Sequence, residues 1–413
     1  MTVSPGRIVG IAVGALAILG IGVYGPAMLL GPLPAVAVQS EGAAVPAPAA
    51  TQIPMPAEGA SVLAVVDDTG AANPIATGGD QGVVPIGAAA KLVTLLVTLD
   101  SLPLAAGSAG PDLPIGAEDY ADYARYQAEG TRVLQVSPGE RWSQRDVLRA
   151  VLLASSNNHA DTLVRWAFGS VGQYVDAANE WLAANGFADT RVADATGLSG
   201  DNVGTVTDLA GLAASVVDTP ALAALLDGEV GGGVGIRQVP DVASRLGDQG
   251  VRAITRGFTD QALISFVFTA TTSPAGSDPV RVVGAMTLIP DYETLDAAVI
   301  AAVEAAGQAA VPVDVITAGD AYGSAVAAWG DRADLVASAT RTSLGWSAAA
   351  GEATVEVEPF TTANAGRDIG RVVVPTPTGE LASPLSLSED IGDPGPIWRL
   401  TNPLPIIGAY FDS

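Results

Sequence analysis

Residues 85–94 of this chain read PIGAAAKLVT, and the apolar run continues as LLVTL to residue 99. Leucines recur at helical spacing, at positions 92, 95, 96 and 99, and this pattern predicts a buried helix over residues 88–99. Ala88 comes three residues before Lys91, so the two side chains share one face of the predicted helix. Lys91 is the only lysine among 19 basic residues. A coding bias towards arginine explains the other basic residues but leaves open why lysine persists here.

The composition predicts a folded chain without metal or cofactor chemistry. The 413 residues are 49% apolar and 15% charged, enough for two or three domains with a large core. There is no cysteine, and His159 is the only histidine. Thiolate metal sites, cysteine nucleophiles and multi-histidine zinc sites are therefore excluded. We predict neither a metal nor a cofactor.

The charge excludes one class of partner. The formal net charge is −25, and no cluster of basic residues occurs. Binding to a phosphate backbone requires clustered lysine and arginine. We therefore expect no nucleic-acid partner.

The N-terminal segment predicts a membrane anchor. Residues 8–40 carry no charge, and Arg7 precedes them. About 20 apolar residues cross a bilayer, and the positive-inside rule keeps the N-terminus in the cytoplasm. A cleavable signal peptide is the alternative, with Ala-Val-Ala at 35–37 as a cleavage site. Both interpretations place the rest of the chain outside the cytoplasm. The favoured one predicts a single-pass protein of the cell membrane.

The whole chain divides into four parts by composition. Residues 1–39 form the anchor, 40–59 an Ala/Pro-rich linker, 60–308 an α+β domain and 309–413 a small all-β domain. Within the α+β domain we expect strands and helices over these ranges: strands 60–66, 261–270 and 280–289, and helices 143–154, 160–168, 171–184, 206–226 and 292–306. Residues 231–235 (GGGVG) lack the Lys and Ser/Thr of a phosphate loop and are interpreted as a connector.

Two further motifs follow the Lys91 helix. Ser155-Ser156-Asn157 comes directly after the helix predicted to begin at the Ser143 cap. Residues 254–259 read ITRGFT.

In order and spacing, these motifs resemble the SxxK, SxN and KTG motifs of the serine D-alanyl-D-alanine carboxypeptidases, the low-molecular-mass penicillin-binding proteins. Residues 194–202 (DATGLSGDN) and 166–170 (WAFGS) are similar to actinobacterial members. The resemblance implies a DD-peptidase/β-lactamase-like domain, an antiparallel sheet flanked by helices, and a peptidoglycan stem peptide or cell-wall partner as ligand. It implies catalytic and substrate-binding roles for these residues: Lys91, Ser155 and Asn157 as catalytic, and Thr255, Arg256, Gly257 and Thr259 as substrate-binding.

The chain departs from the family pattern at the nucleophile. Ala88 occupies the serine position, and loss of a serine nucleophile costs on the order of 10⁶ in kcat. Thr255 stands at the KTG lysine position. Arg256 is one residue further along, so on a strand its side chain points to the opposite face. We therefore predict a pseudoenzyme that binds stem peptides.

Two alternatives remain open at this point. One is a residual carboxypeptidase in which Ser155 acts as a displaced nucleophile with Lys91 as its base. The other is an envelope interaction protein that works through residues 309–413.

Overall fold

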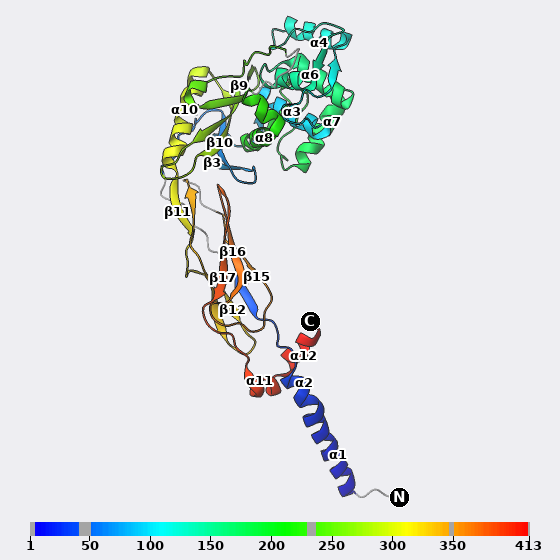
Figure 1. Cartoon of the computed structure of the whole chain (residues 1–413), viewed down its shortest axis with the longest axis vertical. Helices are drawn as coiled ribbons and strands as arrows, with labels where there is room; N and C mark the ends of the chain where they lie inside the picture. The colour runs from blue at the N-terminus through cyan, green and yellow to red at the C-terminus, as the bar shows by residue number, and fades with distance from the viewer. Residues whose placement is uncertain (1–4, 41–50, 229–236, 347–350, 412–413) are drawn as a thin grey trace.

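The computed structural model describes residues 5–40, 51–228, 237–346 and 351–411. The protein is elongated (Figure 1), with the N-terminal helix at one end, a β domain in the middle and the α+β domain at the far end. The predicted connector at 231–235 and half of the predicted linker, residues 41–50, lie outside the described residues.

The N-terminal end is one helical rod. It comprises α1 (Pro5–Leu19), the π-helical turn η1 (Gly20–Tyr24) and α2 (Gly25–Leu29). Residues Gly6–Leu29 form a 24-residue helix that is long and apolar enough to cross a membrane. The predicted N-terminal apolar helix is confirmed.

The α+β domain is built on a five-stranded antiparallel sheet in the order β3-β2-β10-β9-β8. Its strands are β2 (Ala60–Val66), β3 (Ala72–Gly79), β8 (Val251–Thr259), β9 (Leu263–Thr272) and β10 (Val280–Ile289). The sheet and its flanking helices confirm the predicted α+β class, because the strands come from both ends of the domain and most helices lie between them in sequence.

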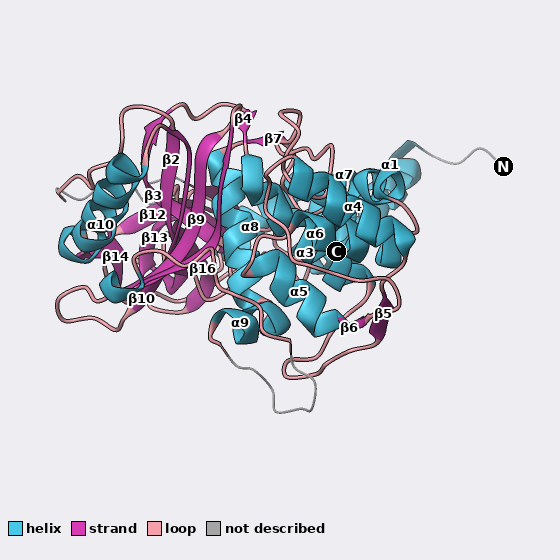
Figure 2. Cartoon of the chain, turned by 90° about the horizontal axis from the view of Figure 1, so that it is seen from above, coloured by secondary structure: helices cyan, strands magenta, loops and turns pink. Residues whose placement is uncertain are grey.

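Alternation along β2 explains why the sheet is covered on both faces. Val62 and Ala64 pack in the core that contains α8 (Val206–Asp218). Leu63 and Val65 pack in the core that contains α10 (Tyr292–Ala309). Successive strand residues point to opposite faces, so a strand with apolar residues on both faces requires a layer on each side. Figure 2 shows α10 on one side of the sheet, and α8 with the helix cluster on the other.

The helix cluster surrounds one buried helix. Its members are the 3₁₀ turn η2 (Gly87–Ala89), α3 (Ala90–Ser101), α4 (Ala117–Ala128), α5 (Gln144–Leu152), α6 (Asn157–Phe168), α7 (Val171–Ala184), α8 and α9 (Pro220–Leu226). Short strands β4 (Val84–Pro85), β5 (Asp112–Pro114), β6 (Arg141–Ser143) and β7 (Val203–Gly204) brace its loops. In α3, residues 90–99 are all buried, as expected for a helix that is apolar all round. The Ser143 hydroxyl caps α5 by accepting the N–H of Asp146 at 3.1 Å.

The β domain contains a six-stranded sheet, β1-β12-β13-β17-β16-β15, and the pair β11–β14. The bounds are β1 (Ala37–Ser40), β11 (Val311–Ile316), β12 (Ala321–Val326), β13 (Arg332–Ala337), β14 (Arg341–Gly345), β15 (Thr354–Val357), β16 (Asp368–Thr376) and β17 (Gly379–Leu387). The predicted C-terminal β structure is confirmed. The pairing of β1 with β12 was not predicted, because four residues at the boundary between anchor and linker carry too little pattern.

Two C-terminal helices, α11 (Gly395–Thr401) and α12 (Pro403–Phe411), bring the chain back to the anchor. The Tyr24 hydroxyl donates to the carbonyl of Leu400 at 2.6 Å, and Arg399 donates to the carbonyl of Gly31 at 2.8 Å. The C-terminus therefore lies beside the exit of the N-terminal helix (Figure 1).

Candidate active-site cleft

Lys91 lies on the first turn of α3 and is 3% exposed. Its ammonium donates to the carbonyl of Thr196. That carbonyl belongs to a loop held by Asp194, whose Oδ1 accepts the N–H groups of Thr196 at 2.7 Å and Gly197 at 2.6 Å. The 194–202 stretch noted in the sequence therefore positions the acceptor for the lysine.

Burial changes the proton affinity of Lys91. Loss of solvation lowers its pKa to about 8, with a further lowering from Arg132 and an opposing effect from Asp194. At neutral pH the ammonium form still dominates. No carboxylate of the described residues contacts this buried cation directly, so the ammonium is available to an anionic ligand.

A cavity of about 230 Å³ opens beside Lys91. It is lined by Ala88, Lys91, Gly130, Thr131, Arg132, Ser155, Asn157, Thr196, Gly197, Leu198, Gly257, Phe258 and Thr259. The structure therefore brings together six residues that the sequence singled out, from three separate segments. They are Ala88, Lys91, Ser155, Asn157, Gly257 and Thr259.

Strand β8 forms one wall and approaches the 88 position closely. A Cβ atom added to Gly257 would lie 2.4 Å from the Cβ of Ala88, a separation that real side chains do not reach. Only glycine fits there. Thr255, two residues earlier, donates its hydroxyl to the carbonyl of Ala88 at 3.3 Å, which ties the strand to the turn that precedes α3.

Ser155 and Asn157 lie at the junction of α5 and α6. Ser155 has a φ of 51°, the left-handed region that non-glycine residues rarely adopt and that often marks functional sites. Asn157 is 2% exposed, and its Oδ1 has no hydrogen-bond partner among the described residues. A buried amide oxygen without a partner costs stability unless a ligand supplies a donor.

The neighbouring Ser156 and Asn158 have a different environment. The Ser156 hydroxyl donates to Asn158 Oδ1 at 2.8 Å, and the Asn158 amide group donates to the carbonyl of Leu134 at 3.0 Å. Both side chains hold the loop before α5 in place. Along residues 155–158 the two roles therefore alternate: Ser155 and Asn157 line the cavity, whereas Ser156 and Asn158 hold the loop.

Two of the predicted substrate-binding residues do not line the cavity. Thr255 is directed to the backbone beneath Ala88. Arg256 points away, as the strand alternation predicts: its Nη2 donates to the carbonyl of Val242, and its guanidinium lies 5.4 Å from the ring of Tyr292. The cation that reaches the cavity from this side is Arg132, which sequence reasoning missed because it occupies a loop without any motif.

His159 lies outside the cavity lining. It is fully buried, its Nδ1 shares a hydrogen bond of 2.8 Å with Ser156, and its ring packs 4.3 Å from that of Trp142. Burial lowers its pKa to about 3, so it is neutral at physiological pH. The one histidine therefore has a packing role.

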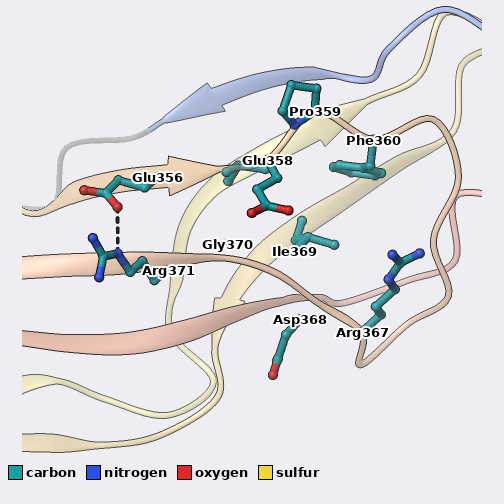
Figure 3. A pocket seen from close by; sticks show the side chains of 10 residues that line it. Glu356, Glu358, Pro359, Phe360, Arg367, Asp368, Ile369, Gly370 and Arg371 are labelled. Atoms are coloured by element: carbon teal, nitrogen blue, oxygen red, sulfur yellow. Dashed lines mark hydrogen bonds and ion pairs between the residues drawn. The ribbon is translucent and has the colours of Figure 1, made fainter.

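A larger hollow of about 480 Å³ lies on the β domain, between β15 and β16. Figure 3 shows its lining, with Glu356 bonded to Arg371 and Phe360 at the opposite end. It is formed mainly by an edge strand and a turn, and its side chains include no nucleophile beside a base. The residues of the three sequence motifs that line a cavity belong to the smaller one: Ala88, Lys91, Ser155, Asn157, Gly257 and Thr259.

Comparison with known proteins gives the family. The sequence profile described as D-alanyl-D-alanine carboxypeptidase matches residues 50–283, more than half of the chain. The chain belongs to this family. The match spans the α+β domain up to β10 and includes every residue of the cleft.

Individual relatives agree with this assignment. A D-alanyl-D-alanine endopeptidase of Pseudomonas aeruginosa is 32% identical over 171 residues, which span 41% of this chain and 52% of that protein. The chain described here thus spans about half the length of this relative.

Solved structures share the fold. Penicillin binding protein 5 from Haemophilus influenzae superposes with a TM-score of 0.58 at 18% identity, covering 83% of this chain and 100% of that one. Penicillin binding protein 6B from Escherichia coli gives 0.59 at 15% identity, covering 82% and 98%. The coverage extends beyond the α+β domain, so the fold likeness includes β-domain elements.

Proposed function

We propose that this carboxypeptidase-family protein binds the D-alanyl-D-alanine ends of peptidoglycan stem peptides and does not hydrolyse them. The observation that carries the proposal is the placement of Ala88. Its methyl group faces Gly257 at the mouth of the Lys91 cavity, where the family motif requires a serine hydroxyl.

The residues that remain support binding without turnover. An alanine side chain has no atom that can attack a carbonyl group. Lys91 and Asn157 still line the cavity, the first as a buried cation and the second as an unpaired acceptor. These groups interact with a bound peptide in its ground state and form no covalent bond with it.

The test uses the full-length protein in detergent micelles. Binding of a peptide that ends in D-Ala-D-Ala is measured by calorimetry, and release of free D-alanine is measured over the same period. We expect binding without release, and no covalent labelling by a fluorescent penicillin. Release of D-alanine by the wild-type protein would contradict the proposal, and so would absence of binding.

A residual carboxypeptidase is a second candidate, favoured by the position of Ser155. Ser155 lines the same cavity as Lys91, and among the described residues nothing accepts its hydroxyl hydrogen. The substitution Ser155→Ala distinguishes binding without turnover from residual activity. If the wild-type protein releases D-alanine and Ser155→Ala does not, Ser155 is the nucleophile. An interaction role for residues 309–413 stays a prediction.

We also propose four parts for the chain: an anchor at 1–39, a linker at 40–59, a carboxypeptidase-like domain at 60–308 and a β domain at 309–413. The strand β1 amends it, because it belongs structurally to the β domain. We propose that the cleft faces the extracytoplasmic side, with the uncleaved helix as tether.

The exposed apolar side chains of α11 and α12 support the membrane tether. Ile397, Leu404 and Phe411 are 79–84% exposed, next to the end of the apolar helix. Side chains of this kind at the bilayer surface are stabilised by lipid contact. Protease added to intact spheroplasts is expected to digest the chain beyond residue 40; complete protection of that part would contradict the orientation.

A further inference from the structure

The cleft has a charge opposite to that of the protein. The chain carries a net charge of −25, yet two of the residues that line the cavity are cations, Lys91 and Arg132. Within the described part of the chain, no carboxylate joins them in the lining. Low-dielectric walls strengthen the field of charges in such a cleft, so its chemistry favours an anionic ligand.

The guanidinium of Arg132 forms a hydrogen bond through Nη1 and leaves its Nε–Nη2 edge without an acceptor among the described residues. Its Nη1 donates to the carbonyl of Arg256 at 2.9 Å, which fixes the guanidinium against β8. Neither Nε nor Nη2 donates to any group in the described ranges, and no acidic side chain there pairs with it. The Nε–Nη2 edge is a planar pair of donors that matches the two oxygens of a carboxylate.

Other arginines in the same domain are paired differently. Arg165 bonds Asp119 at 2.7 Å and Asp122 at 2.6 Å. Arg245 forms a two-pronged bond with Asp296. Arg165 and Arg245 thus take a carboxylate from the protein, whereas Arg132 lines a cavity with no carboxylate in its described lining. Burial and the neighbouring Arg256 lower the pKa of Arg132, which indicates an uncompensated positive charge.

The Nε–Nη2 edge of Arg132 can supply the positive charge that the absent KTG lysine does not. Thr255 occupies that lysine's position and is bonded to the backbone, while Arg256 points to the far face of β8. Arg132 approaches from the loop after α4 and rests on the carbonyl of Arg256, so its charge reaches the cavity beside Gly257 from another element.

We propose that Arg132 binds the C-terminal carboxylate of the peptide held in the cleft, and so determines preference for a free chain end. Asn157, the buried amide with an unpaired oxygen, accepts an N–H of the same peptide. This inference rests on the proposed function, and it adds the residue and the ligand group that set specificity.

The experiment compares two peptides and four variants of the full-length protein in detergent micelles. The peptides are identical and end in D-Ala-D-Ala, one as the free acid and one as the C-terminal amide. We expect the wild-type protein to bind the acid at least tenfold more tightly than the amide. Arg132→Gln should remove this preference, with weaker binding of the acid and unchanged binding of the amide.

The other variants separate charge from geometry. Arg132→Lys keeps the charge without the two-pronged edge and should retain only part of the preference. Arg256→Gln, on the far face of β8, should keep the full preference. Arg332→Gln, on the exposed surface of the β domain, controls for the loss of one positive charge.

The outcomes distinguish the two proposals. If the wild type binds the acid tightly and Arg132→Gln preserves the preference, the assignment of Arg132 is wrong while the proposed function stands. If the wild type binds neither peptide, both proposals are overturned. Unchanged affinity for the amide shows that the variant cleft is folded. If Arg132→Gln does not fold, Arg132→Lys decides instead: a full tenfold preference in that variant rejects the two-pronged contact.

Discussion

The side chain of Ala88 and the backbone of Gly257 are in direct contact across the mouth of the cleft: a Cβ atom on Gly257 would lie 2.4 Å from the Cβ of Ala88. The contact joins the start of the buried helix α3 to the edge strand β8. It also fixes how much space position 88 offers, and thus what a restored hydroxyl would meet.

Restoring the hydroxyl tests whether the rest of the cleft is competent. The substitution Ala88→Ser places an oxygen one helical turn before Lys91. We expect this variant to be labelled covalently by a fluorescent penicillin, while the wild type is not. The double variant Ala88→Ser/Lys91→Met should lose the labelling. Failure of Ala88→Ser to react would show that the cleft has lost more than its nucleophile.

Crowding at the same contact predicts a double-mutant effect. Gly257→Ala should destabilise the domain by roughly 1–3 kcal/mol, because the new methyl overlaps that of Ala88. Adding Ala88→Gly should recover part of the loss, which thermal unfolding measures. Gly247→Ala is the matched control, since nothing lies within 4 Å of its added Cβ. Equal losses in the two single variants would argue against the contact.

Lys91 predicts a pH-dependent stability. Its pKa is lowered from 10.5 to about 8 in the folded state, so between these values the unfolded chain holds a proton that the folded chain has released. The free energy of unfolding attributable to Lys91 therefore rises with pH across this window. Lys91→Met should be more stable than the wild type by roughly 1–3 kcal/mol below pH 8.

That advantage should shrink as the pH approaches 10.5. The measurement is the difference in Tm between the two proteins over this range. A difference that stays constant with pH would show that Lys91 is solvated in the folded state.

Two adjacent asparagines should behave in opposite ways. Asn158 bonds Leu134 and Ser156, so Asn158→Ala should cost about 1–3 kcal/mol. Asn157 has a buried oxygen without a partner among the described residues, so Asn157→Ala should leave stability unchanged within about 0.5 kcal/mol. Peptide binding should weaken for Asn157→Ala at a temperature where both variants are folded. The reverse order of stabilities would contradict the division of roles.

The sequence predicted the parts of the cleft that depend on spacing along one element. Ala88 and Lys91 share a helix face, and Arg256 points away from the cavity because strand residues alternate. The Ser143 cap follows from an equally local rule. None of these features requires knowledge of which segments meet in space.

Features created by tertiary contact were beyond the sequence. Arg132 reaches the cavity only because its loop lies against β8, and a lone arginine in a loop carries no periodic signal. His159 is buried because Trp142, from another segment, covers it. Strand β1 exists because β12 supplies its hydrogen bonds, and propensity alone is a weak guide to so short an edge strand.

The pairing of β1 with β12 also determines how the protein carries mechanical load. The cleft-bearing domain is an insertion between β1 and β11, so the chain enters the β domain, leaves it and returns. Tension along the membrane helix pulls first on β1, whose register from Ala37–Val326 to Ser40–Gly323 is held in shear by the sheet. The bond from Arg399 to Gly31 shares that tension, so a pull on the helix reaches the β domain before it reaches the peptide cleft.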